Sequence, residues 1–415
     1  MSTLQELASA PTTEELLARF QPIFDDIAAG AAAREAKREL AYDDVARLKE
    51  AGFGSLRIPQ EFGGLGATLG QSIAILARLG EADSNLVQAL RAHFTTIEGL
   101  LVGDHEQQEQ WFPRIVSGDL LGNATTEKGN LPGKNSTVLT QRDGRLFLNG
   151  TKFYSTGSLY ADWIKVHADT EDGDSVRVAV HRSAPGLELI DDWDGFGQRL
   201  TASGTTRFTD VGVLPSAVSP YSASLTAGPF AAYVQLVLLT ALVGVGRAAR
   251  RDAVHYVRTR TRAFAHGVGS DPQRDPLIQE VIGRVSATVF GVEAALKVAT
   301  EEVEQAFLFA ADGTLTPERI NDVDTTISEA QIIIVEQVLD ATNRLFEVGG
   351  ASATSESRRL DRHWRNARVI GQHNPVIYRA REVGQQRLTG DFVTTPVYVG
   401  KSSSNSANSS QEHVK

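Results

Sequence analysis

Sulfur-bearing side chains are almost absent from this sequence. Its 415 residues include no cysteine, and the single methionine is the first residue. The lack of cysteine excludes disulfide bonds, thiolate metal sites and a cysteine nucleophile. Thiols and thioethers are also the side chains most readily oxidised, so their scarcity fits a protein that resists oxidation or one made when sulfur is scarce. Compositional drift in a genome rich in arginine and alanine is the alternative explanation.

Positive charge is in deficit. Forty-one lysines and arginines stand against 51 aspartates and glutamates, which gives a formal net charge of -10. This balance argues against a general nucleic-acid-binding surface. The nine histidines are scattered without the spacing of metal ligands, so we expect no metal site.

A membrane-spanning or targeting segment is not expected. The first residues lack the basic and apolar regions of a signal peptide, which predicts a cytoplasmic protein. One apolar run, residues 229–246, approaches the length of a membrane span of about 20 residues. Tyrosine, glutamine and threonine interrupt it, and arginines follow at once. The run therefore predicts a buried helix of a soluble bundle, with no membrane partner.

Periodicity divides the chain into three folded parts and a tail. Residues 1–120 show helical spacing of apolar side chains. Residues 121–225 hold short β-rich runs around an Asp-Gly and an Asn-Gly dipeptide, both typical of hairpin turns, which predicts a small barrel or sandwich. Residues 226–395 return to long helical patterns, typical of a bundle. The serine-rich residues 396–415 predict a flexible tail. The expected class is α+β, mainly α.

A glycine-rich stretch imitates a dinucleotide-binding motif. Residues 244–249 read Gly-Val-Gly-Arg-Ala-Ala, which fits the loose pattern G-x-G-x-x-A. That motif requires a strand before it and a helix after it. Here both flanks continue one helical pattern, so we predict close helix packing and not a nicotinamide site. The sequence also contains no P-loop, HExxH or G-x-S-x-G motif.

Four stretches, in this order, resemble the acyl-CoA dehydrogenase superfamily. They are Leu-Lys-Glu-Ala-Gly with the later Ile-Pro-Gln-Glu-Phe-Gly-Gly-Leu-Gly within 48–66, Gly-Asp-Leu-Leu-Gly-Asn-Ala-Thr-Thr-Glu at 118–127, Leu-Asn-Gly-Thr-Lys-Phe-Tyr-Ser-Thr-Gly at 148–157, and Asp-Arg-His-Trp-Arg-Asn-Ala-Arg at 361–368. Together they span nearly the whole folded chain. The resemblance implies an N-terminal helical domain, a central β-barrel or sandwich, a C-terminal four-helix bundle and assembly as a homotetramer.

One loop departs from the dehydrogenases of this superfamily. These enzymes usually carry a Tyr-Glu-Gly-Thr loop whose glutamate removes a proton from an acyl thioester. Here residues 372–375 read Gln-His-Asn-Pro, which places His373 at the position of that glutamate. The His-Asn-Pro loop, the Asn-Ala pair at 123–124 and the phrase Trp-Asp-Gly-Phe-Gly-Gln-Arg-Leu-Thr-Ala-Ser-Gly at 193–204 resemble the branch of flavin-dependent monooxygenases similar to dibenzothiophene monooxygenase.

This branch implies a two-component, FMNH2-dependent monooxygenase. A separate NAD(P)H:flavin reductase supplies reduced FMN, and O2 converts it to a C4a-hydroperoxide that oxygenates an organosulfur compound in sulfur scavenging. FAD is less expected, because Gly-Gly-Ala-Ser at 349–352 departs from the longer Gly-Gly-x-Gly-Tyr pattern that serves an adenine. The alternatives are a C- or N-hydroxylating monooxygenase of the same fold, a true acyl-CoA dehydrogenase and a non-catalytic flavin-binding relative.

The resemblance also implies the residues of the site. His93 and His373 would flank the reactive edge of the flavin, and the Thr156 hydroxyl would bond its N5 or an activated oxygen. A satisfied core histidine is the alternative for His93, and simple β-propensity is the alternative for Thr156. Arg262 would reach the flavin phosphate of a neighbouring subunit. The other predicted flavin contacts are Asn123, Thr125, Tyr154, Ser155, Trp193, Ser203, Gly349 and Gly350.

Overall fold

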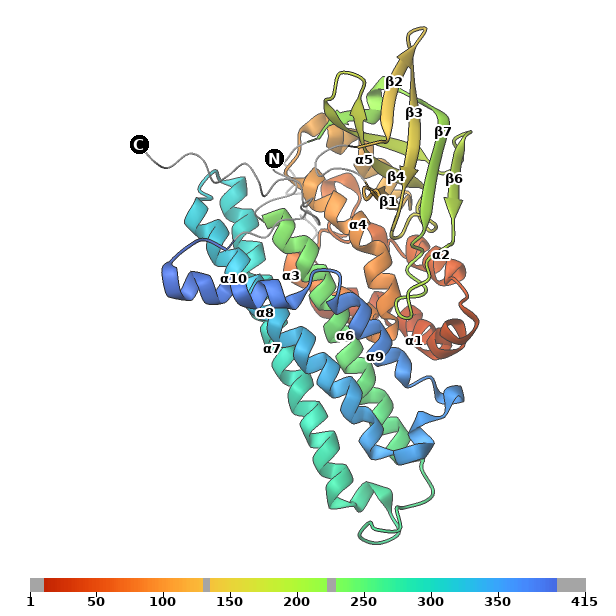
Figure 1. The fold of residues 1–415 in the computed structure, drawn as a ribbon, viewed down its shortest axis with the longest axis vertical. Helices are drawn as coiled ribbons and strands as arrows, with labels where there is room; N and C mark the ends of the chain where they lie inside the picture. The colour runs from red at the N-terminus through yellow and green to blue at the C-terminus, as the bar shows by residue number, and fades with distance from the viewer. Residues whose placement is uncertain (1–10, 130–134, 222–228, 394–415) are drawn as a thin grey trace, which may run out of the picture.

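A helical N-terminal part opens the chain and packs between a sheet and a helix bundle (Figure 1). The structure is a computed structural model that describes residues 11–129, 135–221 and 229–393, so the predicted tail at 396–415 lies outside the described residues. The N-terminal helices are α1 (Thr13–Lys37), α2 (Tyr42–Glu50), α3 (Leu69–Ala82), α4 (Ser84–Leu101) and α5 (His105–Val116).

Polar caps fix where these helices begin. The Thr12 side chain accepts a hydrogen bond from the Glu15 amide, and Glu15 reciprocates, which forms a capping box before α1. Thr68 and Gln71 form the same arrangement before α3. Asp83 separates α3 from α4 and caps α4 through the amide of Asn85. The capping at Asp83 lets the chain turn sharply, so α4 starts directly behind α3.

The middle of the chain forms one sheet. Its strands are β1 (Leu121–Ala124), β2 (Val138–Arg142), β3 (Arg145–Lys152), β4 (Trp163–Thr170), β5 (Ser175–His181), β6 (Leu187–Ile190), β7 (Thr205–Val213) and β8 (Val218–Pro220). The order is β6-β7-β3-β2-β4-β5-β8, with β1 added in parallel to β4. Leucine, valine and isoleucine of alternating positions fill its own core cluster.

Of the two predicted turns, one is confirmed and one is wrong. Asp143 and Gly144 both have positive φ, at 49° and 73°, and connect β2 to β3 as a tight hairpin turn. Gly150 instead lies inside β3, where the pairing with β7 shifts register. A Cβ at this position would lie 2.5 Å from the Thr137 Cα. The Asn-Gly dipeptide therefore marks a bulge, because the neighbouring backbone comes too close for a side chain.

The C-terminal part consists of long helices. They are α6 (Pro229–Thr259), α7 (Pro276–Ala311), α8 (Pro317–Arg344), α9 (Asp361–Gly371) and α10 (Val376–Thr389). The apolar window of α6 meets the length and hydropathy of a membrane span, but 94% of it is buried inside the protein. The prediction of a buried helix is therefore confirmed, and α6 is in contact with α3, α4, α7, α8 and α9. The predicted class, mainly helical with a central β part, is confirmed.

The dinucleotide-like motif lies within α6 and packs against α3. A Cβ on Gly244 would lie 2.3 Å from the carbonyl carbon of Gly80, so the two backbones touch. No strand precedes the motif, since α6 runs through it without a break. The prediction of close helix packing is confirmed.

Candidate active site

Helix α4 brings the sheet and the bundle to one place. The loop after β3 lies directly on it, because a Cβ on Gly157 would come within 2.1 Å of the Ala89 carbonyl oxygen. Gly157 also has a φ of 78°, so both its conformation and its space favour glycine. Two residues further along α4, Arg91 contacts the loop that joins α9 to α10. Chain segments from all three parts therefore meet on this helix.

Five of the predicted flavin contacts come together where two loops meet. The Ser155 amide donates to the Gly204 carbonyl at 2.9 Å, and Ser203 Oγ donates to Thr156 Oγ1 at 2.9 Å. The rings of Tyr154 and Trp193 lie edge to face, 6.1 Å between centroids. The loop of residues 153–157 and the loop of residues 193–204 therefore form one surface.

A chain of hydroxyl groups ends at Thr156. Thr201 Oγ1 donates to the Gln198 carbonyl at 3.0 Å and lies 2.8 Å from Ser203 Oγ. Ser203 donates onward, so Thr156 Oγ1 accepts and its own proton has only a 3.4 Å contact with the Tyr154 carbonyl. Such a contact is long for an O–H donor. Thr156 is thus arranged to donate to another acceptor.

The same surface contains an unsatisfied polar group and a strained residue. Ser155 Oγ is buried and has no hydrogen-bond partner among the described residues. Tyr154 adopts a φ of 56°, which is uncommon for an aromatic residue, and its ring is exposed. Buried orphaned groups and positive-φ residues of this kind are concentrated at ligand sites. These observations fit a planar, polar cofactor on this surface.

The end of β1 lies next to this surface. Ser158 Oγ, at the far side of the loop, donates to the Asn123 carbonyl at 3.0 Å. Lys152 Nζ contacts the Thr125 carbonyl at 3.3 Å. The structure therefore brings Asn123 of β1 and Thr125, which follows β1, beside the loop of residues 153–157 through their main-chain carbonyls.

His373 contacts helix α4 through the side chain of Arg91. Its Nε2 is 3.2 Å from Nη2 of Arg91. A guanidinium can only donate, so Nε2 accepts and the proton of the neutral ring is on Nδ1. Desolvation and the charge of Arg91 lower the pKa of His373 to about 3, although a side-chain hydrogen bond with Asn374 acts against this shift. The ring is therefore neutral at physiological pH.

Asn374 fixes the loop that carries His373. Its side-chain amide donates to Gln235 of α6 at 2.7 Å, and its carbonyl accepts from Gln331 of α8 at 2.6 Å. Both glutamines are buried. The histidine is thus held by two helices of the bundle.

The prediction that His93 acts in catalysis is not supported by its surroundings. The ring is fully buried; the Leu121 amide donates to Nδ1 at 3.2 Å, and Nε2 lies 2.8 Å from the Gly54 carbonyl. Because Nδ1 accepts, Nε2 carries the proton and donates to Gly54. Desolvation lowers the pKa of His93 to about 4. Both nitrogens therefore bond the backbone, as in the alternative of a satisfied core histidine.

Three further predicted residues lie elsewhere. Arg262 follows the end of α6, Gly349 follows η6 (Leu345–Val348), and Gly350 begins η7 (Gly350–Thr354). The chain segments that follow α6 and α8 lie at the end of the bundle away from the sheet (Figure 1). A Cβ on Gly350 would lie 3.1 Å from the Phe264 ring, which places this glycine beside the segment of Arg262. Arg262, Gly349 and Gly350 therefore lie near one another, but within one chain they are separate from the predicted flavin contacts on the two loops.

A buried ion pair below the loop of residues 153–157 was missed by the sequence reasoning. Lys152 is fully buried, and its Nζ bonds Glu127 Oε1 at 2.6 Å and Asn135 Oδ1 at 2.9 Å. Although burial opposes ionisation, Lys152 and the donors of Ser136 and Thr137 lower the pKa of Glu127 to about 2. A lysine on a strand beside a predicted loop gives no sign in sequence that it points inward.

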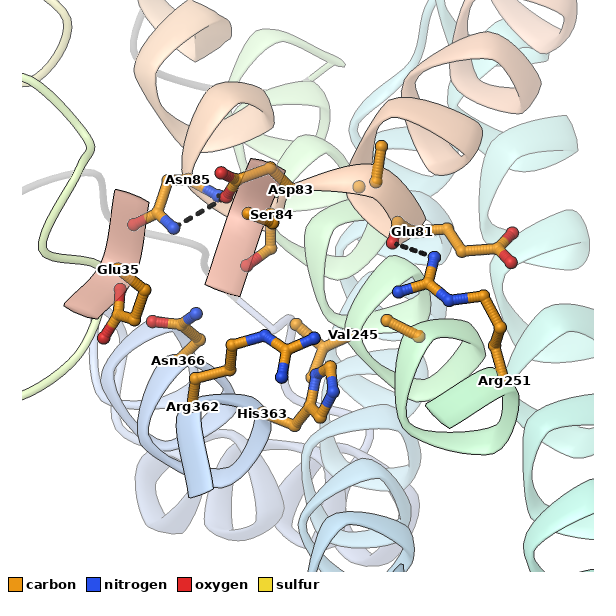
Figure 2. Close-up of a pocket in the computed structure, with 14 residues that line it drawn as sticks. Glu35, Glu81, Asp83, Ser84, Asn85, Val245, Arg251, Arg362, His363 and Asn366 are labelled. Carbon is orange, nitrogen blue, oxygen red and sulfur yellow. Dashed lines mark hydrogen bonds between the residues drawn. The ribbon is translucent and has the colours of Figure 1, made fainter. Parts of the chain in front are cut away.

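A second buried network ties α9 to α6. Asp252 of α6 accepts from Arg362 at 2.6 Å and lies 2.8 Å from His363 Nε2. Burial opposes ionisation, but these partners lower the pKa of Asp252 well below its usual value. Figure 2 shows Arg362 and His363 facing a pocket whose other walls include Asp83 and Asn85. Each charged group that lines the pocket pairs with a residue just outside it, so we assign the pocket a structural role.

The loop of residues 193–204 is anchored to the same helix, α9. The Gln198 amide donates to Asn366 Oδ1 at 2.6 Å, and the Phe196 ring stacks on Trp364. Positioning α9 thus positions both this loop and His373. Over residues 11–129, 135–221 and 229–393, no group of three or more histidines, aspartates or glutamates is arranged to hold a metal ion.

Comparisons with known proteins match this arrangement. The family description "Acyl-CoA dehydrogenase, N-terminal domain" matches residues 12–119, and "Acyl-CoA dehydrogenase, C-terminal domain" matches residues 236–377. Dibenzothiophene monooxygenase from Rhodococcus qingshengii is 29% identical, over 83% of this chain and 86% of the relative. A probable FMNH2-dependent monooxygenase, SfnC of Pseudomonas putida, is also 29% identical, over 82% and 86%.

Solved structures agree. FMN-bound TdsC from Paenibacillus sp. A11-2 superimposes with a TM-score of 0.84 at 27% identity, over 92% of this chain and 99% of that one. The methanesulfinate monooxygenase MsuC from Pseudomonas fluorescens gives a TM-score of 0.81 at 26% identity, over 91% and 97%. With two matched domains and these relatives along nearly its whole described length, the chain belongs to the acyl-CoA dehydrogenase superfamily and is similar to its flavin-dependent monooxygenase branch.

Proposed function

We propose that this protein is a two-component monooxygenase that uses reduced FMN and O2 to oxygenate a small organosulfur compound. The named relatives support it: dibenzothiophene monooxygenase, the probable FMNH2-dependent SfnC, FMN-bound TdsC and the methanesulfinate monooxygenase MsuC. Their names span unlike sulfur substrates, so they support the reaction class more than any one substrate.

The observation that carries the proposal is the state of His373. A dehydrogenase of this superfamily needs a base with a free lone pair to remove a proton from carbon. The Nε2 lone pair of His373 accepts from Arg91, and the low pKa leaves the ring neutral. The remaining nitrogen, Nδ1, carries a proton. This imidazole is therefore a hydrogen-bond donor to an oxygen atom, and not the base of an acyl-CoA dehydrogenase.

The residues of the two loops fit FMN. Thr156 has a hydroxyl proton to donate, Ser155 has a buried hydroxyl without a partner, and Trp193 presents an indole beside them. Bound FMN in its reduced form would supply the two electrons that activate O2. One oxygen atom is transferred to sulfur and the other leaves as water.

The chain's own groups orient and protect this chemistry. Thr156, fixed by Ser203, would donate a hydrogen bond to the ring edge, and Tyr154 and Trp193 would cover a ring face. His373 would donate its Nδ1 proton to the reacting oxygen. Buried α4 and α6 side chains exclude water, which limits loss of activated oxygen as hydrogen peroxide.

We further propose a cytoplasmic homotetramer that receives reduced FMN from a separate NAD(P)H:flavin reductase. Exposed apolar side chains on the bundle support assembly, among them Phe290 of α7 and Ile377 and Leu388 of α10. Assembly would let Arg262, Gly349 and Gly350 of one subunit serve the flavin of another. No convincing nicotinamide motif occurs in the sequence, which supports a separate reductase.

The test is a coupled oxygenation assay. Purified protein, FMN, NADH and a flavin reductase are incubated under 18O2 with sulfides, sulfoxides, sulfones and sulfinates, and products are weighed by mass spectrometry. We expect one 18O atom in a sulfur product. Desaturation of an acyl-CoA with an artificial electron acceptor, and no labelled sulfur product, would establish the dehydrogenase alternative instead.

A further inference from the structure

Arg91 is a partly buried cation without a carboxylate partner among the described residues. Its Nη2 donates to His373, and its Nε is buried with no hydrogen-bond partner. Desolvation lowers the pKa of Arg91 to about 10, and no acidic side chain acts against that shift. The guanidinium is nevertheless charged at physiological pH.

Two other arginines close to α4 and α9, Arg57 and Arg362, pair with carboxylates. Arg57 bonds Glu98 at 2.7 Å, and Arg362 bonds Asp252 at 2.6 Å. A cation removed from water without a counter-ion is destabilising, so an unpaired one needs a reason. Perturbed, unpaired charges of this kind are concentrated at binding and catalytic sites. The contrast with Arg57 and Arg362 indicates that an anion completes the environment of Arg91.

The surroundings of Arg91 restrict where that anion lies. His373 is in direct contact with the guanidinium, and Ala89, two residues earlier, touches the loop of Thr156. Gln88, one turn earlier on α4, is buried, and its amide oxygen has no hydrogen-bond partner among the described residues. The charge thus lies next to the histidine that we assign to the reacting oxygen.

We propose that Arg91 anchors the anionic group of the substrate, and that the substrate class is the small alkanesulfinates. This inference rests on the proposed function. Because Arg91 touches His373, the charged group must be adjacent to the atom that is oxidised. A sulfinate meets this requirement, since its two charged oxygens and its oxidisable sulfur are directly bonded. A neutral thiophene has no charge to offer, and a long-chain acid places its charge too far away.

The reaction balances for this substrate. The sulfur lone pair of RSO2− forms a bond to one atom of O2, the O–O bond breaks, and the second oxygen atom leaves as water with two protons. The two electrons and two protons come from FMNH2, which becomes FMN, and the product is the sulfonate RSO3−. The Arg91 fork holds the two sulfinate oxygens throughout, because a guanidinium suits planar or bidentate anions.

The first test measures binding without turnover. Protein loaded with oxidised FMN is titrated by calorimetry with methanesulfonate, an unreactive anion, and with dimethyl sulfone, a neutral molecule of similar shape. Wild type should prefer methanesulfonate by at least about tenfold, as expected for a charge-assisted bidentate contact. Arg91→Met should remove the preference, and Arg91→Lys should retain part of it. Arg145→Met, on the exposed β2–β3 hairpin, is the matched control and should bind as wild type (Figure 1).

The second test separates binding from positioning of His373. Turnover is compared for methanesulfinate and for dimethyl sulfoxide, in which a methyl group replaces the charged oxygen. Arg91→Met should raise KM for methanesulfinate by about tenfold or more and leave KM for dimethyl sulfoxide unchanged. An equal fall in kcat for both compounds, or equal binding of the sulfonate and the sulfone to wild type, overturns the proposal. If no sulfur compound is oxygenated, the proposed function fails, whereas the calorimetry still decides the role of Arg91.

Discussion

Ser203 donates a hydrogen bond to Thr156 across 2.9 Å and so joins two loops that are 47 residues apart in the sequence. Ser203 gives its single hydroxyl proton to this bond, so the Thr156 oxygen is the acceptor. The Thr156 proton is therefore left to donate to a ligand on the surface of the two loops.

Replacing Thr156 by valine tests the role of that hydroxyl proton. The variant keeps the shape of the side chain and loses the hydroxyl, so Ser203 loses its acceptor and the ligand loses a donor. We expect FMN to bind about three- to tenfold more weakly, in line with about 1 kcal/mol for one hydrogen bond. Quenching of FMN fluorescence gives the dissociation constant. Thr156→Ser should bind FMN as wild type, and equal affinities for all three proteins would remove the hydroxyl from the site.

His373→Ala should uncouple oxygen consumption from product formation. The variant removes the Nδ1 donor but leaves α4, α6 and the loop anchor Asn374 in place. We expect unchanged folding, a lower yield of oxygenated product and a matching rise in hydrogen peroxide, measured with peroxidase dye against total NADH used. An unchanged ratio of product to peroxide would exclude His373 from the reaction. Glutamine at 373, which can also donate, is the control and should retain part of the coupling.

His93 should affect stability with pH and leave coupling unaltered. Folding lowers the pKa of His93 from 6.5 to about 4. As the pH falls below 6.5, His93 becomes protonated in the unfolded chain but stays neutral in the folded protein. Stability is therefore full above pH 6.5 and is lost as the pH falls toward 4, by up to about 1.4 kcal/mol per pH unit.

The measurement is the melting temperature at pH 7.5, 6.0 and 5.0 for wild type and His93→Gln. The variant should melt lower at pH 7.5, because two buried backbone groups lose a well-placed partner, at a cost of about 1–3 kcal/mol. Its melting temperature should then fall less steeply with acid. His167 and His363 also have lowered pKa values, so some slope remains and the difference between the two slopes isolates His93. A changed ratio of product to peroxide in His93→Gln would restore a catalytic role.

The buried pair of Glu127 and Lys152 should show strong coupling. Glu127→Gln or Lys152→Met alone leaves one buried charge without its counter-ion, and we expect each to destabilise the protein by about 3–5 kcal/mol. The double variant removes both charges and should recover much of that loss. Urea denaturation, monitored by circular dichroism, gives the free energy of unfolding of all four proteins in this double-mutant cycle. Additive effects of the two changes would mean that the pair is worth little.

Much of the fold could be predicted from the sequence because its signals are local. The short β-rich runs of residues 121–225 and the long helical patterns of residues 226–395 depend on neighbouring positions alone, and the strands β1 to β8 and the helices α6 to α10 lie within these two ranges. The Asn-Gly dipeptide at 149–150 failed for the opposite reason. The glycine at 150 is required by close contact with the backbone of Thr137, which is adjacent in the sheet but distant in the sequence.

The site could be predicted only in part, because its residues meet through long-range contacts. The motifs assigned the loops of Thr156 and Ser203 to one flavin site, and the structure places these two loops in contact. They gave no sign of Arg91, which is one arginine on an amphipathic helix until the fold brings His373 against it. They also could not show that His93, on the same helix, points the other way into backbone partners.

The contact between Gly80 and Gly244 has a consequence for annotation and engineering alike. At this crossing α3 and α6 meet main chain to main chain, with no room for a methyl group. Saturation mutagenesis at codon 244 should therefore return glycine almost exclusively. A motif scan would attribute that intolerance to nucleotide recognition, whereas its origin is purely steric.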